Sequence, residues 1–365
     1  MSRKKILVAM SGGVDSSAAA ALLLEAGHEV AGATMRTWAS EECAARGSRS
    51  CCGLAGAEDA RRVADRLGIR HWVFNFEKEF KEKVMDPFAA EYLRGRTPNP
   101  CISCNEHVKF RLFWDRARQL GFEDMASGHY ARVGRDPGRG VSWIEEGRDP
   151  RKDQSYVLFP LDQELLGHLH LPAGELTKTE IRNFAKVKGL EVWDKEESQE
   201  ICFVPDDDYG LFLKRRYVGE ESAPGVIRMK DGTVLGPHDG YYHYTRGQRR
   251  GLGVAWRERL YVLGTDPERN EVVVGTKQEI FAKQCSVRGV HWFLEPDFSR
   301  GPVQACVKIR SQHTKAPAAL EPAQTPGELR VSFHDAQDAI TPGQAAVFYD
   351  GPRVLGGGWI EEVFG

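Results

Sequence analysis

Residues 11–17, SGGVDSS, bring two glycines, an aspartate and three serines together between two apolar segments. Glycine allows a close approach to the backbone and unusual dihedral angles, and the first N–H groups of a helix have no partner within that helix. A junction of this kind suits an anion, most often a phosphate. The alternative is an ordinary strand–turn–helix junction capped by Asp15 or a serine. No lysine follows the glycines at Walker spacing, and the G-x-G-x-x-G dinucleotide pattern is absent.

A second candidate site lies in residues 95–110, GRTPNPCISCNEHVKF. Two prolines keep the chain extended, and Cys101 and Cys104 follow as a C-x-x-C pair at or near the start of a helix. A helix N-terminus lowers the pKa of a thiol and so favours the reactive thiolate. Half a zinc site, a redox pair, or a nucleophile with a neighbour would all fit this pair. A zinc ribbon needs a second C-x-x-C, which the sequence lacks.

Two further stretches combine polar residues with a possible chemical role. Cys202 lies between SQEI and an acidic turn that contains proline, a polar setting that argues against a simple buried thiol. Lys152, Asp153 and Gln154 form a dense polar triplet ahead of an apolar segment, for which a solvated loop is the alternative.

A basic and aromatic stretch, HDGYYHYTRGQRRGLGV, follows at residues 238–254. Arg246, Arg249 and Arg250 are interleaved there with the aromatic run at residues 241–244. Arginine beside aromatic rings is typical of surfaces that meet a phosphate backbone and unstacked bases. The alternative is a glycine-rich turn with surface arginines.

The remaining cysteines fall into two groups. Cys43, Cys51 and Cys52 lie in a loop rich in Gly, Ser and Arg, and no role follows for them from the sequence. Cys285 and Cys306 lie in a strand-rich region, where we expect buried structural thiols.

The whole chain has the composition of a globular protein with more than one domain. It has 365 residues, of which 41% are hydrophobic and 28% charged, with a net charge of −2. No apolar stretch reaches transmembrane length and no signal peptide is visible, so we expect a cytoplasmic protein. Its eight cysteines should then be mostly reduced, which favours metal, redox or sulfur chemistry. Because the net charge is small, a nucleic acid would have to be held by local basic patches.

The elements that must position these residues alternate in the first half of the chain. Strands are predicted at residues 6–10, 28–38 and 70–76, and a further strand that runs into a loop at 123–133. Helices are predicted at 18–26, 54–69, 79–95 and 109–122. This order predicts a doubly wound parallel sheet, an α/β fold of Rossmann type with ligands at the carboxyl ends of the strands. From about residue 287 the chain predicts short strands separated by turns, typical of a small β-barrel or sandwich.

Taken together, these stretches resemble one family, the tRNA-specific 2-thiouridylases of the MnmA/TrmU type. The resemblance covers nearly the whole chain. Its markers are, in order, AMSGGVDSS, TPNPCISCNEHVKF, ASGHYAR, KDQSYVL, SQEICFVPDDDY and DGYYHYTRGQRRGLG. SGGxDS alone would indicate only the wider ATP-pyrophosphatase (PP-loop) group. The resemblance implies a catalytic domain at residues 1–208, a small central domain at 209–280 and a C-terminal β-barrel at 281–365.

The implied reaction is ATP-dependent 2-thiolation of the wobble uridine of tRNA. ATP is cleaved to AMP and pyrophosphate as the C2 oxygen is adenylated, and sulfur then arrives from a cysteine persulfide. The family implies tRNAs for Glu, Gln and Lys as substrates, a sulfur-relay protein or cysteine desulfurase as donor, and Mg²⁺ with the ATP.

The resemblance also implies roles for individual residues. Cys202 matches the residue that carries the persulfide, and Cys104 matches the nucleophile that releases its sulfur and leaves a Cys104–Cys202 disulfide. The positions that match the ATP contacts are Ala9, Met10, Ser11, Gly12, Gly13, Val14, Asp15, Ser16, Met35 and Gly128. The segment that matches the contact with the target base is Asn99, Pro100 and Cys101. The positions that match tRNA contacts are His129, Lys152, Asp153, Gln154, Arg310, Ser311 and Gln344.

Cys101 departs from the family pattern, because many relatives have aspartate there. Cys101, Cys104 and Cys202 could therefore hold three irons of a [4Fe–4S] cluster whose fourth iron binds a sulfide. The persulfide relay needs only Cys104 and Cys202, and both routes stay open. Two other functions also stay open: a different PP-loop enzyme that adenylates a non-tRNA substrate, and a non-catalytic RNA-binding module.

Overall fold

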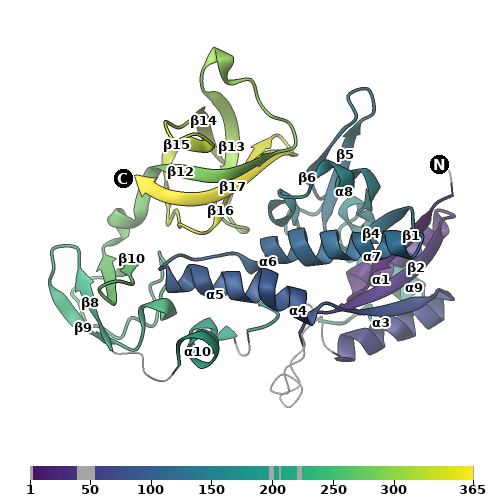
Figure 1. The fold of residues 1–365 in the computed structure, drawn as a ribbon, viewed down its shortest axis with the longest axis horizontal. Helices are drawn as coiled ribbons and strands as arrows, with labels where there is room; N and C mark the ends of the chain where they lie inside the picture. The colour runs from purple at the N-terminus through teal and green to yellow at the C-terminus, as the bar shows by residue number, and fades with distance from the viewer. Residues whose placement is uncertain (1–2, 39–53, 197–200, 205–206, 220–223, 365) are drawn as a thin grey trace. The chain divides into compact units, whose positions relative to one another are not determined.

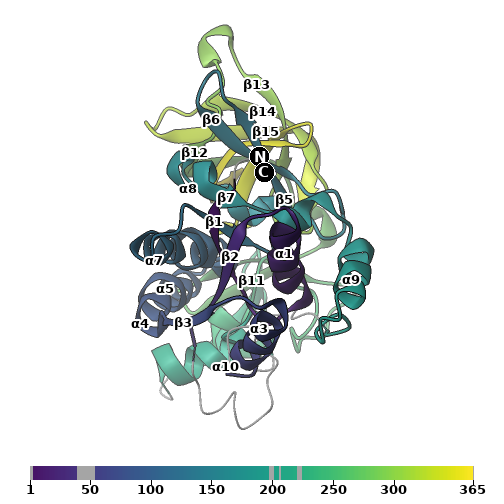
Figure 2. The ribbon, with the colours of Figure 1, turned by 90° about the vertical axis from the view of Figure 1, so that its right-hand side faces the viewer.

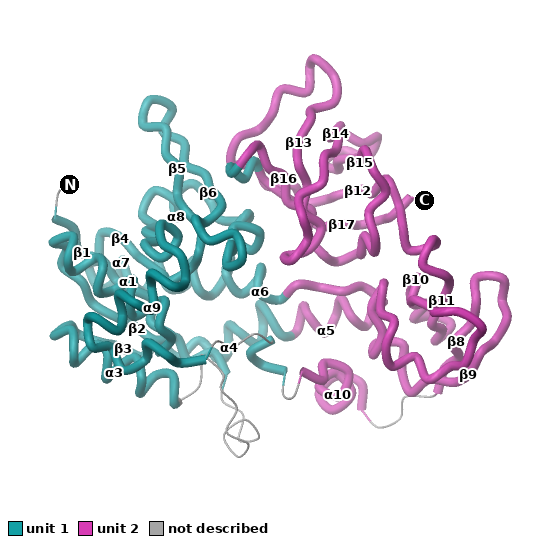
Figure 3. The backbone as a smooth tube through the Cα atoms, turned by 180° about the vertical axis from the view of Figure 1, so that it is seen from behind, with its two compact units in different colours: residues 1–85, 100–205, 352–355 teal, residues 86–99, 206–351, 356–365 magenta. Residues whose placement is uncertain are grey.

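The computed structural model describes residues 3–38, 54–196, 201–204, 207–219 and 224–364. The chain forms two compact units (Figure 3). Unit 1 contains residues 1–85, 100–205 and 352–355, and unit 2 contains residues 86–99, 206–351 and 356–365. The loop SGGVDSS and the cysteines 101, 104 and 202 all belong to unit 1. The loop containing Cys43, Cys51 and Cys52 lies outside the described residues.

A five-stranded parallel sheet forms the centre of unit 1 (Figure 1), in the order β3-β2-β1-β4-β7. Its strands are β1 (Lys5–Ala9), β2 (Glu29–Arg36), β3 (His71–Asn75), β4 (Asp124–Ser127) and β7 (Leu169–His170). The strand order reverses between β1 and β4, and ligands of open α/β sheets bind outside the carboxyl ends at such a reversal. Because SGGVDSS directly follows β1, the loop lies at this point of the sheet.

Helices cover both faces of this sheet. In Figure 2, α1, α3 and α9 lie on one face and α7 on the other. The helices of unit 1 are α1 (Val14–Glu25), α3 (Leu54–Leu67), α4 (Glu77–Phe80), η1 (Lys81–Met85), α6 (Pro100–Ser103), η2 (Cys104–Leu112), α7 (Phe113–Gln119), η3 (Ser155–Leu158), α8 (Gln163–His168), η4 (Pro172–Glu175) and α9 (Lys178–Val187). The alanines of α1 are buried against β1, α3 and α9, so small side chains let this helix pack closely. Gly27 follows the helix with a φ of 87°, the left-handed conformation that ends many helices.

The segment predicted at 123–133 as a strand running into a loop contains β4 and the start of a second strand. β4 ends at Ser127, and β5 (Ala131–Asp136) pairs with β6 (Val141–Glu146) as an antiparallel hairpin. Between them, a Cβ on Gly128 would lie 2.5 Å from the amide nitrogen of Ser16, so only glycine fits. Residues 128–130 therefore pass directly beside the first turn of α1.

The C-x-x-C pair lies at the start of a long helical segment. α6, η2 and α7 follow one another from Pro100 to Gln119, and Ser103 and Leu112 at the junctions keep helical dihedral angles. Proline is favoured in the first helical turn because its missing N–H has no partner to lose there. The prediction that the two cysteines begin a helix is confirmed.

Unit 2 contains a small mixed sheet and a β-barrel. The sheet has the order β10-β11-β8-β9 and encloses a core that includes Ile227, Val262 and Val274. The barrel strands follow the order β12-β15-β14-β13-β16-β17, and pairing between β12 and β17 closes it. The elements are α5 (Asp86–Leu93), α10 (Tyr209–Leu213), η6 (Lys214–Val218), β8 (Gly225–Met229), β9 (Val234–His238), η7 (Tyr241–His243), β10 (Tyr261–Asp266), β11 (Glu271–Gly275), η8 (Lys277–Ile280), β12 (Phe281–Trp292), η9 (Phe298–Arg300), β13 (Val303–Lys308), β14 (Ala316–Pro322), β15 (Glu328–Asp338), β16 (Ala345–Asp350) and β17 (Arg353–Phe364).

The predicted fold class is confirmed: an α/β protein with an N-terminal parallel sheet, a small central domain and a C-terminal barrel. Of the two alternatives predicted for the last part, the closed barrel is the correct one. Within the described ranges, no helix is long and apolar enough to cross a membrane.

Candidate functional site

The loop between β1 and α1 is shaped by its two glycines. Gly12 has a φ of 74°, and a Cβ there would lie 2.2 Å from the carbonyl oxygen of Gly56. Gly13 is the N-cap of α1, and because glycine has no side chain this cap residue makes no side-chain hydrogen bond to the first turn. The first N–H groups of α1 therefore keep their capacity to bind an anion.

The serine hydroxyls of the loop bond mainly to the loop itself. Ser16 Oγ accepts a hydrogen bond from the Ser11 amide at 3.1 Å, and Ser17 Oγ donates to the Gly13 carbonyl at 2.8 Å. Ser16 is 5% exposed and Ser17 is fully buried. These two hydroxyls fix the shape of the loop, and the backbone N–H groups are its anion donors.

Asp15 is held by two side chains that the sequence did not identify. Lys178 Nζ lies 2.7 and 2.8 Å from the two carboxylate oxygens of Asp15, and the Tyr130 hydroxyl donates to Oδ1 at 2.6 Å. Lys178 is the first residue of α9, where the helix dipole disfavours a cation, and it is only 9% exposed. A lysine in this unfavourable position was the signal available in the sequence. Lys178 brings to the loop the positive charge that a Walker lysine would supply.

Three consecutive residues connect this loop to the helix of the C-x-x-C pair. Gly128 packs against the backbone of Ser16, and Tyr130 bonds to Asp15. Between them, the His129 ring lies 5.3 Å from the ring of Phe110 on η2, and its Nδ1 lies 2.9 Å from Ser127 Oγ. Burial, aided by the charge of Lys109, lowers the pKa of His129 to about 3. His129 is thus neutral at pH 7.

The three candidate thiols have different environments. Cys101 is exposed, Cys104 is 6% exposed, and Cys202 is half-buried in a turn closed by a hydrogen bond from the Val204 amide to the Ile201 carbonyl. The next residue, Phe203, packs edge-to-face on Phe80 at 5.6 Å and anchors this turn in the core of unit 1.

The hypothesis of an iron–sulfur cluster is not supported. Among the described residues, which include Cys101, Cys104 and Cys202, no three cysteine, histidine or acidic side chains come together as metal ligands. Cys101 and Cys104 lie on one helical segment, but the Cys101 side chain is exposed and the Cys104 side chain is buried. The three thiols therefore do not fit a [4Fe–4S] cluster.

The polar triplet at 152–154 mostly makes hydrogen bonds that hold residues 128–130 and the neighbouring turns in place. Gln154 Oε1 accepts from the Tyr130 amide at 2.9 Å, and the Gln154 amide donates to the Tyr130 carbonyl at 2.8 Å. Asp153 accepts hydrogen bonds from the amides of Gly147 and Ser155. Lys152 is half-buried beside them.

Other predicted residues belong to the edge of unit 1 or to unit 2. Ala9 ends β1, and Met35 lies one residue before the end of β2, so both are at the carboxyl edge of the sheet. In unit 2, Gln344 donates to the Thr97 carbonyl at 2.9 Å, two residues before Asn99. Arg310 donates to the Asp338 carboxylate at 2.9 Å, and Ser311 follows it.

The arginines of the basic stretch are not equivalent. Arg249 and Arg250 are exposed. Arg246 instead donates to the carbonyl of Leu263, and burial lowers the pKa of its guanidinium. Only the first two are thus available to a phosphate backbone, and Arg246 supports the sheet of unit 2.

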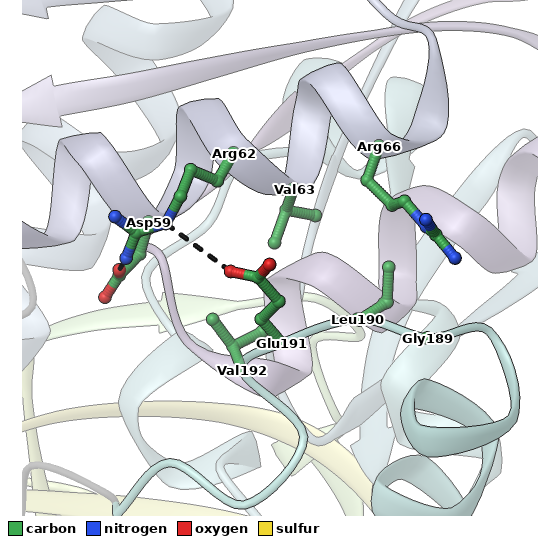
Figure 4. Close-up of a pocket in the computed structure, with 8 residues that line it drawn as sticks. All are labelled: Asp59, Arg62, Val63, Arg66, Gly189, Leu190, Glu191 and Val192. Atoms are coloured by element: carbon green, nitrogen blue, oxygen red, sulfur yellow. Dashed lines mark hydrogen bonds and ion pairs between the residues drawn. The ribbon is translucent and has the colours of Figure 1, made fainter.

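A small cavity of about 60 Å³ lies between α3 and the turn that follows α9 (Figure 4). Arg62 and Glu191 lie across it with their charged groups 3.6 Å apart. Asp59, at one end of the cavity, bonds to Lys195, whose ammonium group also reaches the carbonyl of Gly12. The cavity is too small for a nucleotide, but its wall supports the loop.

Comparison with known proteins identifies the family. Family models match residues 4–206 (tRNA methyl transferase HUP domain), 211–276 (tRNA methyl transferase PRC-barrel domain) and 282–360 (Aminomethyltransferase beta-barrel domain). A tRNA-specific 2-thiouridylase MnmA from Geobacter metallireducens is 49% identical over 362 residues, covering 98% of this chain and 97% of that protein. The chain belongs to the tRNA-specific 2-thiouridylase MnmA family. The resemblance inferred from the sequence is confirmed.

Other relatives of the MnmA family agree. The protein of that name from Carboxydothermus hydrogenoformans is 49% identical over 361 residues, covering 99% of this chain and 98% of its own length. The protein from Pelotomaculum thermopropionicum is 47% identical over 362 residues, covering 99% of this chain and 98% of its own length. Among solved structures, an NH3-dependent NAD synthetase from Campylobacter jejuni matches 52% of this chain and 66% of its own, with a TM-score of 0.30 and 18% identity, a similarity too low to support a conclusion.

Proposed function

We propose that this protein is an ATP-dependent tRNA-uridine 2-sulfurtransferase that acts on the wobble uridine. The observation that carries this proposal is the segment 128–130, which touches both the loop of α1 and the C-x-x-C helix. Gly128 packs on the loop, Tyr130 bonds to Asp15, and His129 packs on Phe110 of that helix. Residues 128–130 thus contact both the loop that suits an anion and the helix that carries Cys101 and Cys104. This arrangement suits a reaction that activates an oxygen and then replaces it with sulfur.

The first chemical step is adenylation. The C2 oxygen of uridine attacks the α-phosphorus of ATP, and pyrophosphate leaves. The backbone N–H groups at the start of α1 would bind the phosphates, and the Lys178 ammonium adds positive charge beside them. Mg²⁺ bound with ATP would neutralise phosphate charge.

The second step replaces the adenylated oxygen with sulfur. In the proposed relay, Cys202 carries a persulfide. The Cys104 thiolate attacks the inner sulfur of Cys202, so a Cys104–Cys202 disulfide forms and hydrogen sulfide is released. The sulfide attacks C2, and AMP leaves with the former oxygen. A dithiol reductant then restores the two thiols.

We also propose a division of tRNA contacts between the units. In unit 1, Pro100 and Cys101 would meet the target base together with the preceding Asn99, and His129 and the 152–154 triplet would contact tRNA nearby. In unit 2, the residues that would contact tRNA are Arg249, Arg250, Arg310, Ser311 and Gln344. His129 would bind as a neutral ring, by stacking or hydrogen bonding, because its pKa is low. Methyl transfer, which the family-model descriptions name, needs neither an ATP-phosphate loop nor paired thiols.

The test is incubation with ATP, Mg²⁺, a persulfide donor and unmodified tRNA for Glu, Gln or Lys, followed by nucleoside analysis. We expect one 2-thiouridine for each AMP formed. Cys104→Ser and Cys202→Ser should each lower thiolation at least about 100-fold, since each removes an atom that reacts. Cys306→Ser, in the barrel strand β13, is the matched control and should retain activity. AMP without thiolation would indicate another adenylating enzyme, and tRNA binding without turnover a non-catalytic RNA-binding protein.

A further inference from the structure

Lys195 makes two contacts that join the loop to distant parts of unit 1. Its Nζ donates to the carbonyl oxygen of Gly12 at 3.1 Å and to Asp59 Oδ2 at 2.5 Å. The loop is 183 residues away in sequence, and Asp59 on α3 is 136 residues away. A lysine that bonds to a carbonyl of the ATP loop acts on the backbone of the loop itself.

The backbone of Lys195 is itself held in place. Its amide donates to the Val192 carbonyl at 3.2 Å, and its carbonyl accepts from Arg182 Nη2 at 3.3 Å. Just before it, the turn at residues 189–192 packs on α3 around the cavity of Figure 4. The ammonium group therefore approaches Gly12 from a supported position.

The contact with Gly12 fixes the direction of one peptide group. A peptide unit is planar and trans, so the Gly12 carbonyl and the Gly13 N–H point in opposite directions. Since the carbonyl points to Lys195, the Gly13 N–H points away from it. Gly13 is the N-cap of α1, so this N–H lies next to the other donors of the first helical turn.

Without this anchor the peptide could turn over. Glycine lies on both sides of the bond, and glycine accepts left- and right-handed dihedral angles with similar ease. A reversed peptide would direct the partly negative Gly12 carbonyl toward the phosphates in place of an N–H donor. The loop would then repel the anion that it is built to bind.

We propose that Lys195 is a positioning residue that locks the Gly12–Gly13 peptide in its anion-binding orientation, with Asp59 holding the lysine in place. The identity of the anion as ATP phosphate rests on the proposed function. Lys195 does not itself bind ATP in this proposal, which separates it from a lysine that contacts the phosphates directly.

The experiment is isothermal calorimetry of ATP binding to the full-length chain and to four variants. Lys195→Met should raise the Kd for ATP about tenfold, and Lys195→Arg should recover most of the affinity because a guanidinium also donates to a carbonyl. Asp59→Asn should raise the Kd about threefold, because the lysine is no longer held by an ion pair. Lys188→Met breaks the comparable ion pair with Glu25 far from the loop and should bind ATP like the wild type.

Asp59→Asn separates positioning from direct phosphate contact. If Lys195 bound phosphate directly, removing its carboxylate partner would free it and leave ATP binding unchanged or tighter. That result overturns the proposal, as does wild-type affinity in Lys195→Met. Should Lys195→Met fail to fold, the other two variants decide: the proposal expects near-wild-type ATP affinity in Lys195→Arg and weaker binding in Asp59→Asn, and unchanged or tighter binding in Asp59→Asn overturns it. The affinity for tRNA should stay within about twofold in every variant, which a general loss of structure would not allow.

Calorimetry also keeps this proposal separate from the proposed function. A wild-type protein that binds ATP but forms no 2-thiouridine would refute the sulfurtransferase function, while the variants would still decide the role of Lys195. A wild-type protein that does not bind ATP would overturn both.

Discussion

The two edges of the parallel sheet in unit 1 each carry an aspartate that is hydrogen-bonded to a lysine and to aromatic or imidazole side chains. At the carboxyl edge, Asp15 bonds to Lys178 and Tyr130. At the amino edge, Asp124 begins β4 and bonds to Lys4 at 2.7 Å, His170 at 2.6 Å and His168 at 3.0 Å. Local charge alone would make either cluster a candidate site.

Asp15 and Asp124 differ in how accessible their carboxylates are. The side chain of Asp124 is 1% exposed and makes hydrogen bonds to all three partners, so no face is left for a ligand. The side chain of Asp15 is 28% exposed and lies in the first turn of a helix whose N-terminal N–H groups have no side-chain cap. The comparison teaches that similar clusters of polar side chains can differ in accessibility: the buried one stabilises the fold, and the partly exposed one at a helix N-terminus is the one we propose as a binding site.

The largest effect should come from Asp15→Ala. Removing this carboxylate should lower AMP formation at least about 100-fold, the size expected for a preorganised charged group in an active site. tRNA binding should stay near the wild-type level, because in our proposal the loop binds ATP and not tRNA. Steady-state AMP release and a tRNA filter-binding assay measure the two properties.

Asp115→Ala is the matched control, since Asp115 also lies in the first turn of a helix, α7. It should leave AMP formation unchanged. Unchanged AMP release in Asp15→Ala would contradict two statements: that the carboxyl edge differs in function from the amino edge, and that the loop at residues 11–17 binds ATP.

Asp124→Asn should affect stability instead of activity. The substitution removes the buried charge that Lys4, His168 and His170 surround, and breaking a buried ion pair costs about 3 to 5 kcal/mol. Because the amide keeps some hydrogen bonds, we expect the free energy of unfolding to fall by about 2 to 4 kcal/mol. Urea denaturation measures this loss, and the KM for ATP should change less than twofold. If Asp124→Asn were as stable as the wild type but used ATP poorly, the amino edge would have a functional and not a structural role.

The pH dependence of stability should come partly from the same residue. Burial opposes the charge of Asp124, but the hydrogen bonds from His170, Lys4 and His168 outweigh it and lower the pKa to about 2 from an ordinary 3.8. A carboxyl with a lowered pKa stabilises the fold above its unfolded pKa, and this contribution is lost as the pH falls toward the folded value.

The stability difference between wild type and Asp124→Asn should therefore be constant above about pH 5 and shrink by about 2 kcal/mol on going to pH 2. Urea unfolding at several pH values measures it. A difference that is the same at pH 3 and pH 7 would show that the ion pairs do not stabilise the protein through this charge.

The sequence predicted the loop, the C-x-x-C helix and the fold class because each follows from local order. Two glycines before a helix of alanines, and prolines before a cysteine pair, determine backbone geometry over a few residues. Cys104 was noticed as part of the C-x-x-C pair and Cys202 by its polar neighbours, but the roles predicted for both came from the resemblance to the family.

What the sequence did not reveal are partners brought together by the fold. Lys178 lies 163 residues from Asp15 and Lys195 lies 183 residues from Gly12. The residues around Lys178 and Lys195 form no sequence motif from which the partner of either lysine could be predicted. The close approach of Gly128 to the amide of Ser16 was not predicted either, because Ser16 lies more than a hundred residues earlier in the chain. The cluster of three thiols was predicted from the C-x-x-C pair, one distant cysteine and the family resemblance, but in the structure Cys101 is exposed and Cys104 is buried.

Tyr130→Phe should give the smallest effect and tests how much of the carboxyl edge depends on hydrogen bonding. The change removes only the hydroxyl that donates to Asp15 at 2.6 Å, and Lys178 still holds both carboxylate oxygens. A hydrogen bond to a charged group contributes about 1.5 to 3 kcal/mol, but solvent reaches Asp15 and replaces part of it. We therefore expect AMP formation to fall about three- to tenfold, with the protein as stable as the wild type in urea. Tyr156→Phe, which alters another buried tyrosine of unit 1, is the control for loss of a hydroxyl elsewhere. A fall in AMP formation as large as that of Asp15→Ala would mean that Tyr130 touches the nucleotide itself.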